Sequence, residues 1–150
     1  MSGLHDITAI LDFAIGEEIA AAAFYMDLAQ RTTRPDLRET LVGFAREEEG
    51  HRARLEAIKT GAMTLAPHQP VGSLKIADYL VDVAPDPQMS YREALAVAIN
   101  KEKAAYRLYS DLAARTAESS LRNTFLALAA EEARHRLRFE TEYDDLLVEN

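Results

Sequence analysis

The chain has 150 residues, 48% of them hydrophobic, and a formal net charge of −8 at neutral pH. This length suits one domain with a sizeable core, and the acidic balance argues against nucleic acid and anionic membranes as partners. Cysteine is absent, which excludes iron–sulfur clusters and zinc–thiolate sites and fits a reducing, cytoplasmic location. The N-terminus does not resemble a signal peptide, and no apolar run approaches the roughly 20 residues of a membrane span.

The first half of the chain predicts two helices joined by a tight turn. Apolar residues recur every three or four positions from about residue 3 to 32, the pattern of one buried helix face. Arg34-Pro35 interrupts this pattern and starts a second helix, which we expect to stop near Gly61. The predicted buried faces contain Ile7, Leu11, Ala14, Glu18, Ala21, Tyr25, Leu28 and Thr32, then Leu37, Leu41, Phe44, Glu48, His51, Leu55 and Ile58.

The second half predicts a crossover and another pair of helices. Residues 62–89 hold four of the five prolines, and within them we expect one short helix over 73–83, capped by Ser73. Ser90 and Glu93 predict a capping box for a third helix. Hydroxyl residues in 116–120 predict a turn and the N-cap of a fourth helix. The buried faces would contain Tyr91, Leu95, Ala98, Glu102, Ala105, Tyr109 and Leu112, then Leu121, Phe125, Leu128, Glu132, His135, Phe139 and Leu146.

The two halves are repeats of each other at an offset of 84 residues. Between residues 14–32 and 37–56 and their partners, 21 of 39 positions are identical. A duplicated helical hairpin predicts an all-α four-helix bundle with internal pseudo-two-fold symmetry. We expect a single domain built from hairpin 1 (about 3–61), a long crossover with a short helix (about 62–89) and hairpin 2 (about 90–148).

Each repeat contains a Glu-x-x-His motif, which places a carboxylate and an imidazole one turn apart on one helix face. The preceding helix of each repeat adds one Glu in the middle of its apolar face. One such polar residue alone is more often a hydrogen-bonded core residue, but six at matching positions indicate a dinuclear metal site. The six residues are Glu18, Glu48, His51, Glu102, Glu132 and His135.

The charges of these six residues support that interpretation. Four ionised carboxylates in a core are costly through desolvation and mutual repulsion. Two divalent cations bring four positive charges and leave two neutral imidazoles as further ligands. Mixed imidazole and carboxylate ligands suit iron, manganese or zinc.

This pattern resembles the ferritin-like superfamily, in particular rubrerythrin-like and bacterioferritin-like diiron proteins. The resemblance implies that the six residues are ligands of two iron ions, and that iron oxidation is coupled to reduction of peroxide or dioxygen. Rubrerythrins of the best-known type carry a further Glu where this chain has Ala105, so the resemblance does not imply their redox-linked ligand exchange for this chain. Bacterioferritins carry a haem-binding Met where this chain has Glu49, so we expect no haem. Because the chain has no cysteine-rich rubredoxin domain, electrons would come from an external donor.

Other polar and aromatic residues are candidates for supporting roles. Tyr25 and Tyr109 lie two turns after Glu18 and Glu102, where a phenol would hydrogen-bond a ligand, supply one electron, or simply pack in the core. Glu47 and Glu131 would orient the imidazoles or lie solvated on the helix flank. We expect surface ion pairs for Arg52, Arg134 and Arg136, and solvent-facing positions for His5 and His68.

Two functions remain open from the sequence. The favoured one is a diiron oxidoreductase that reduces peroxide or dioxygen and takes part in the response to oxidative stress. The alternative is a non-catalytic metal-binding or iron-handling protein. We expect a homodimer, with Ile15, Phe24 and Val42 available as contact surface, and the long crossover would also allow helices to swap between chains.

Overall fold

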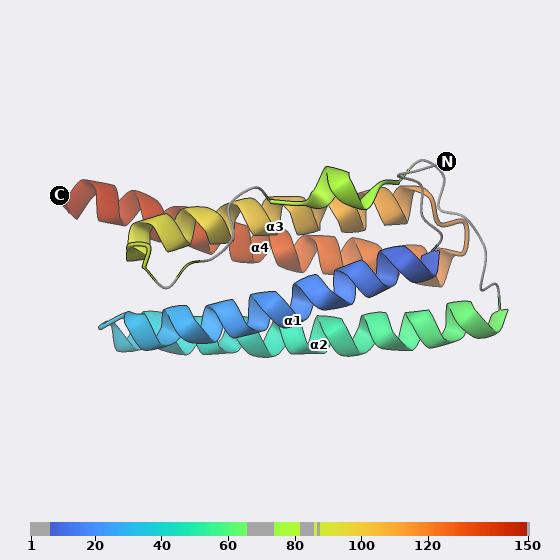
Figure 1. Ribbon diagram of the computed structural model, residues 1–150, viewed down its shortest axis with the longest axis horizontal. Coiled ribbons are helices and arrows are strands. Elements are labelled where there is room, and N and C mark those ends of the chain that lie inside the picture. The colour runs from blue at the N-terminus through green and yellow to red at the C-terminus, as the bar shows by residue number, and fades with distance from the viewer. Residues whose placement is uncertain (1–6, 66–73, 82–85, 87, 150) are drawn as a thin grey trace. The chain divides into compact units, whose positions relative to one another are not determined.

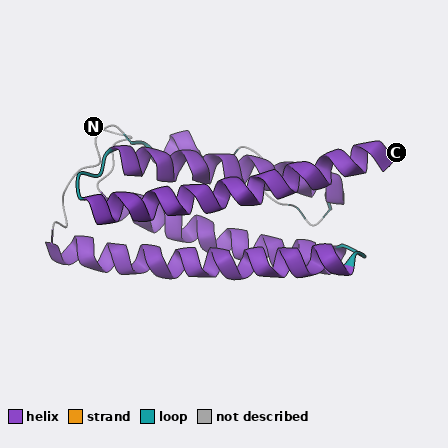
Figure 2. Ribbon diagram, turned by 180° about the vertical axis from the view of Figure 1, so that it is seen from behind, coloured by secondary structure: helices purple, strands orange, loops and turns teal. Residues whose placement is uncertain are grey.

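The computed structural model of the chain describes residues 7–65, 74–81, 86 and 88–149. These residues form four α-helices and one short 3₁₀ helix, namely α1 (Ile7–Arg31), α2 (Pro35–Leu65), η1 (Ile76–Tyr79), α3 (Tyr91–Ala114) and α4 (Ser119–Glu149) (Figure 1). Across the described residues no strand occurs (Figure 2). Within the same part of the chain, no helix is long and apolar enough to cross a membrane.

The chain divides into two compact units, Met1–Asp78 and Tyr79–Asn150. In the first unit α1 packs against α2, and in the second α3 packs against α4. We call the α1–α2 pair hairpin 1 and the α3–α4 pair hairpin 2. The sequence repeat is therefore also a structural repeat of one helical hairpin. That the whole chain is a single domain stays a prediction.

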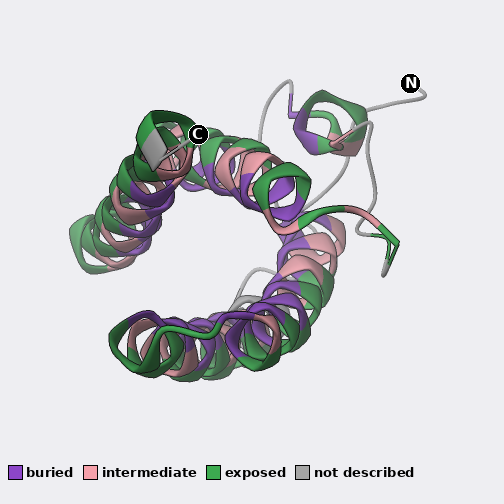
Figure 3. Cartoon of the chain, turned by 90° about the vertical axis from the view of Figure 1, so that its left-hand side faces the viewer, coloured by how far each residue is buried: buried purple, intermediate pink, exposed green. Residues whose placement is uncertain are grey.

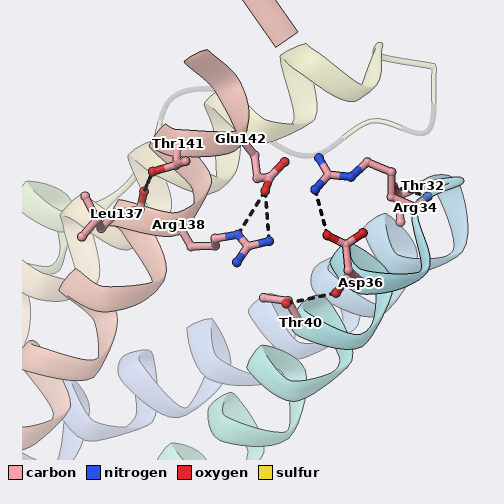
Figure 4. Close-up of polar contacts among 8 residues, drawn as sticks. All are labelled: Thr32, Arg34, Asp36, Thr40, Leu137, Arg138, Thr141 and Glu142. Atoms are coloured by element: carbon pink, nitrogen blue, oxygen red, sulfur yellow. Dashed lines mark hydrogen bonds and ion pairs between the residues drawn. The ribbon is translucent and has the colours of Figure 1, made fainter. Parts of the chain in front are cut away.

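The turn of hairpin 1 is closed by an arginine from α2. The Arg38 guanidinium donates to the carbonyl oxygens of Ala29 at 3.1 Å and Thr32 at 2.8 Å. The last carbonyls of a helix have no partner within the helix, so a cation there satisfies them and interacts favourably with the helix dipole. On the other side of the turn, Arg34 pairs with Asp36 in the first turn of α2 (Figure 4). This pairing lowers the pKa of the Asp36 carboxyl.

The turn of hairpin 2 keeps the arginine but has a different cap. Arg122, the repeat partner of Arg38, donates to the carbonyl of Thr116 at 3.5 Å. We predicted that a hydroxyl residue would cap α4, and this prediction is wrong. The carboxylate of Glu118 accepts instead from the backbone N–H groups of Ser120 at 2.9 Å and Leu121 at 2.7 Å. A carboxylate satisfies these free N–H groups and also complements the positive end of the helix.

The predicted capping box at the start of α3 is confirmed. The Ser90 hydroxyl accepts from the Glu93 backbone N–H at 3.0 Å, and the Glu93 carboxylate accepts from the Ser90 backbone N–H at 3.0 Å. These hydrogen bonds to the charged form lower the pKa of the Glu93 carboxyl. The box fixes where hairpin 2 begins and therefore sets the register of every later position on α3.

The connection between the hairpins differs from the prediction in two places. α2 does not stop near Gly61 but continues to Leu65. A Cβ at Gly61 would meet no other atom within 4 Å, so this glycine marks no turn or close contact. Within 74–81, the described part of the short helix expected over 73–83, the chain forms only the 3₁₀ helix Ile76–Tyr79, and the proposed cap Ser73 lies outside the described residues.

The predicted buried faces are largely confirmed. Every predicted face residue of α1 is buried, and buried positions line the helices of each hairpin (Figure 3). In the other helices the exceptions are only partly buried, and they are Ile58, Tyr91, Ala105, Leu121 and Leu146. The polar residues in the middle of these faces are therefore held inside the protein.

The residues that we expected to form a homodimer surface are not exposed. Phe24 is buried, and Ile15 and Val42 are partly buried, so none of the three is the exposed apolar surface that we expected. The large apolar residues that α1 exposes are Ile19 at 49% and Met26 at 41%. The homodimer itself stays a prediction.

Candidate metal centre

Hairpin 1 brings two carboxylates and one imidazole together at its centre. Glu18 comes from the middle of α1, and Glu48 and His51 come from one face of α2. The Nδ1 atom of His51 lies 3.4 Å from Oε2 of Glu18 and 3.6 Å from Oε1 of Glu48. We call these three residues triad 1.

Hairpin 2 contains the equivalent cluster, with almost the same spacing. Glu102 comes from α3, and Glu132 and His135 come from α4. The Nδ1 atom of His135 lies 3.3 Å from Oε2 of Glu102 and 3.7 Å from Oε1 of Glu132. We call these residues triad 2. The same ring nitrogen and the same carboxylate oxygens converge in both repeats.

All six predicted side chains are buried. None of the six residues exposes more than 2% of its surface, and both histidines expose none. Buried carboxylates at this density need compensating positive charge. In each triad, one potential ligand atom from each residue lies within 4.8 Å of the others. The sequence thus predicted correctly which side chains gather inside each hairpin.

The spacing within each triad fits a shared cation. Divalent metals bind imidazole nitrogen and carboxylate oxygen at about 2.0–2.2 Å, which puts neighbouring ligand atoms about 3.0–3.5 Å apart in octahedral or tetrahedral geometry. The four nitrogen–oxygen distances, from 3.3 to 3.7 Å, lie at or slightly above that range. Such distances are long for a direct hydrogen bond. The donor set of each triad therefore fits a divalent cation, whereas metal ligation itself stays a prediction.

The two candidate tyrosines lie where the sequence placed them. Tyr25 and Tyr109 are buried in hairpin 1 and hairpin 2, respectively, each seven residues after the first Glu of its triad. Glu47 and Glu131 are partly buried beside the Glu-x-x-His motifs. Their roles toward a ligand or an imidazole stay predictions.

The expected surface ion pairs are confirmed for Arg52 and Arg136, and that of Arg134 stays a prediction. Arg52 contacts Glu49 at 2.9 Å and Glu56 at 3.0 Å, and these pairs raise the pKa of the Arg52 guanidinium. Arg136 lies 3.9 Å from Glu140, and Arg134 is exposed. His5 and His68 lie outside the described residues.

Sequence reasoning missed a fifth buried carboxylate, Glu142 of α4. Its Oε1 atom accepts from Arg138 Nε at 3.1 Å and lies 3.0 Å from Arg138 Nη2 (Figure 4). Glu142 lies seven residues after His135, hence on the same helix face, and four after Arg138, a favourable ion-pair spacing. Those two spacings were the signal available in the sequence. Beyond Phe139 the buried face continues onto Glu142, whereas Tyr143 is partly buried and Leu147 is exposed.

A second missed contact anchors the connection to hairpin 2. Tyr79, the last residue of η1, is buried, and its hydroxyl donates to Oδ2 of Asp111 on α3 at 2.6 Å. The guanidinium of Arg107 lies over the Tyr79 ring, 5.7 Å from its centroid. Burial, and then the hydrogen bond to Asp111, raise the pKa of the Tyr79 phenol.

Comparison with solved structures identifies the fold. A hypothetical protein of Pyrococcus furiosus matches with a TM-score of 0.75 and 24% identity, over 95% of this chain and 90% of that chain. A Thermotoga maritima protein, described as a candidate ferritin-like diiron-carboxylate protein, matches with a TM-score of 0.81 and 18% identity, over 96% of this chain and 98% of that one. The predicted ferritin-like helical bundle is therefore confirmed as the fold.

Comparison with protein families agrees with the fold. No curated protein matches the chain. The family model of the ferritin-like domain matches residues 6–141, which is most of the sequence. The chain therefore belongs to the ferritin-like domain family.

Proposed function

We propose that triads 1 and 2 together bind two iron ions and that the protein couples iron oxidation to reduction of peroxide or dioxygen. The observation that carries the proposal is the duplication of one buried Glu, Glu and His set with matching distances. A single set would be weaker support, because an isolated buried polar residue is often only a hydrogen-bonded residue of the core. Membership of the ferritin-like domain family adds to this support.

The charge balance favours two divalent ions over one. The four carboxylates carry four negative charges when ionised, which two divalent ions neutralise, whereas one ion would leave two buried charges uncompensated. The imidazoles contribute as neutral ligands through Nδ1, the atom that faces the carboxylates in each triad. The residues that would hold iron are Glu18, Glu48, His51, Glu102, Glu132 and His135.

The protein's own residues determine the environment of the reaction. Iron, when bound, supplies the reversible change between the ferrous and ferric states that reduction of peroxide or dioxygen needs. The buried faces around the triads exclude bulk water and hold the carboxylates at fixed positions. Tyr25 and Tyr109 are buried on the same helix faces, and we assign to their phenols a hydrogen bond to a ligand carboxylate. The electrons come from an external donor.

Stopped-flow measurement with peroxide tests this proposal. Protein loaded with ferrous iron without oxygen is mixed with stoichiometric peroxide, and ferric absorbance is followed. We expect oxidation much faster than that of free ferrous iron under the same conditions. The Glu48→Ala variant should lose this acceleration, while Glu49→Ala, which changes an exposed neighbour, should keep it.

The same experiment separates the proposal from its alternative. A protein that stores or merely binds metal would take up ions without accelerated reaction with peroxide. Tight zinc binding at both triads, with no peroxide or dioxygen turnover after iron loading, would contradict the oxidoreductase and leave a metal-binding protein.

A further inference from the structure

The composition restricts which side chains can carry single electrons through this protein. The chain has no cysteine and no tryptophan, but six tyrosines. A phenol is readily oxidised by one electron only when its proton leaves at the same time, because the oxidised phenol is a very strong acid. A tyrosine therefore needs a proton acceptor that is already hydrogen-bonded to its hydroxyl.

Tyr79 has such an acceptor. Its hydroxyl donates to the Asp111 carboxylate at 2.6 Å, within the short range of charge-assisted O–H···O⁻ bonds. Burial and Asp111 raise the pKa of the Tyr79 phenol, so the phenol keeps its proton until it is oxidised. Asp111 is itself partly buried, which limits competition from water for the same carboxylate.

Helix α3 connects Tyr79 with triad 2, because it carries both Asp111, the partner of Tyr79, and Glu102. Asp111 lies nine residues after Glu102 on α3, which is about 13 Å along the helix axis. Buried Tyr109 lies between these two positions. Toward the surface, Tyr79 is followed by Leu80, which is 58% exposed, and the Arg107 guanidinium covers its ring. Tyr79 therefore lies between the protein surface and the helix that carries Glu102.

The repeat shows that this arrangement belongs to hairpin 2 alone among the described residues. The partner of Asp111 in hairpin 1 is Asp27, 84 residues earlier, and Asp27 pairs with Arg31 at 4.0 Å. The partner of Arg107 is Ala23, which is exposed. The same aspartate thus serves as a surface ion-pair residue in one repeat and as the acceptor for a buried phenol in the other.

We propose that Tyr79, with Asp111 as its proton acceptor, relays single electrons from the external donor toward the metal centre. The proposal rests on the proposed function. Reduction of one peroxide to two waters takes two electrons and two protons; when iron supplies only one of these electrons, Tyr79 supplies the other, and its phenolic proton moves to the Asp111 carboxylate. The products are a neutral tyrosyl radical and a protonated Asp111. The donor then returns one electron, Asp111 returns the proton, and both side chains regain their original state.

Light-driven oxidation of zinc-loaded protein tests the relay without iron chemistry, because zinc does not change its oxidation state. A ruthenium(III) tris-bipyridine oxidant is generated by a laser flash, and tyrosyl radical is followed by transient absorption. We expect a fast phase of radical formation that slows in D2O and disappears in Tyr79→Phe. Tyr106→Phe, which changes an exposed tyrosine of the same hairpin, should keep that phase.

Asp111 and its repeat partner Asp27 allow a matched pair of variants that leave Tyr79 in place. Asp111→Asn should slow the fast phase by at least about tenfold, below the usual effect of a positioned base. Asp27→Asn should leave it unchanged. If Tyr79→Phe fails to fold by circular dichroism, the two asparagine variants decide the question. A fast phase that survives Asp111→Asn would overturn the proposal and leave Tyr79 as a structural anchor.

Iron-loaded protein separates failure of the relay from failure of the proposed function. After mixing with peroxide, iron oxidation is followed by absorbance and tyrosyl radical by electron paramagnetic resonance. Radical that is lost in Tyr79→Phe but kept in Tyr106→Phe supports the relay. Iron oxidation with equal radical in both variants overturns the relay but not the function. No iron oxidation in any variant overturns the function, and the light-driven measurement then stands alone for Tyr79.

Discussion

Hairpin 1 and hairpin 2 agree most closely where their triads lie and differ most on their outer surfaces. Corresponding nitrogen–oxygen distances are 3.4 and 3.3 Å for the first Glu, and 3.6 and 3.7 Å for the second. In contrast, Met26 of hairpin 1 is exposed where hairpin 2 has Ser110. Ala23 is exposed where Arg107 lies over a buried tyrosine. Two copies that have diverged elsewhere keep the same buried ligand set, as expected if both sets serve one chemistry.

The largest expected effect is the loss of metal affinity when one histidine is removed, and it tests whether the two triads are equivalent. His51→Ala and His135→Ala each remove one ligand from one triad. We expect each to weaken metal binding by more than about 100-fold, above the 10–100-fold typical of residues that only support a ligand. Isothermal titration with a divalent metal measures both affinities. A loss confined to one histidine would show that the triads are not equivalent.

A second prediction concerns the charge of the metal-free protein. Glu48→Gln keeps the shape of the side chain but removes one of four buried carboxylates. Without metal, we expect this variant to be more stable than the parent by about 1–3 kcal/mol, the scale of an uncompensated buried polar group. With metal, the order should reverse, because bound ligand stabilises only the protein that retains the site. Glu49→Gln is the exposed control, and urea unfolding with and without metal measures both.

A third prediction uses the place where the hairpins differ inside the core. Hairpin 2 has buried Glu142 where hairpin 1 has Ile58, and its Arg138 partner is 37% exposed. Glu142→Ala leaves Arg138 able to reach water, so we expect a loss of about 1–3 kcal/mol. Glu142→Ile copies hairpin 1 and should cost less, because apolar replacements of ion pairs are often tolerated. Equal losses of unfolding free energy in Glu142→Ala and Glu142→Ile, measured by urea unfolding, would contradict this account.

The smallest expected effect is the loss of stability when the capping box at the start of α3 is removed. Among the described helix starts, only this one has a capping box. Ser90→Ala should reduce stability by about 1 kcal/mol at neutral pH. Because folding lowers the pKa of Glu93, the contribution of its carboxylate is present at neutral pH and is lost as pH falls through that lowered pKa. The cost of Glu93→Ala should therefore shrink in acid, whereas that of Ser90→Ala, which keeps the backbone N–H that Glu93 bonds, should change less. A cost of Glu93→Ala independent of pH in chemical denaturation would show that its carboxylate takes no part.

Much of the fold and of the triads could be predicted, because both depend on regular spacing along helices. The 3.6-residue period placed Glu18, Glu48 and His51 on inner faces, and the 84-residue offset placed their partners. The capping box was predictable because it is a local pattern. These features need no knowledge of distant contacts.

The missed features depend on contacts that spacing does not encode. Tyr79 lies in a 3₁₀ helix of four residues, too short to show a period, and its partner Asp111 is 32 residues away. Glu118 was missed as a cap because hydroxyl residues beside it have the stronger general preference. The end of α2 was misplaced because glycine is disfavoured in helices by only about 1 kcal/mol, which packing along a long helix readily offsets.

The stoichiometry of iron binding tests the central claim most directly. Protein titrated anaerobically with ferrous iron, separated from free metal and analysed for its metal content should hold two ions per chain. Glu48→Ala should no longer hold two. One ion per chain in the parent protein, or two ions retained by Glu48→Ala, would contradict the assignment of the two triads as a dinuclear iron site.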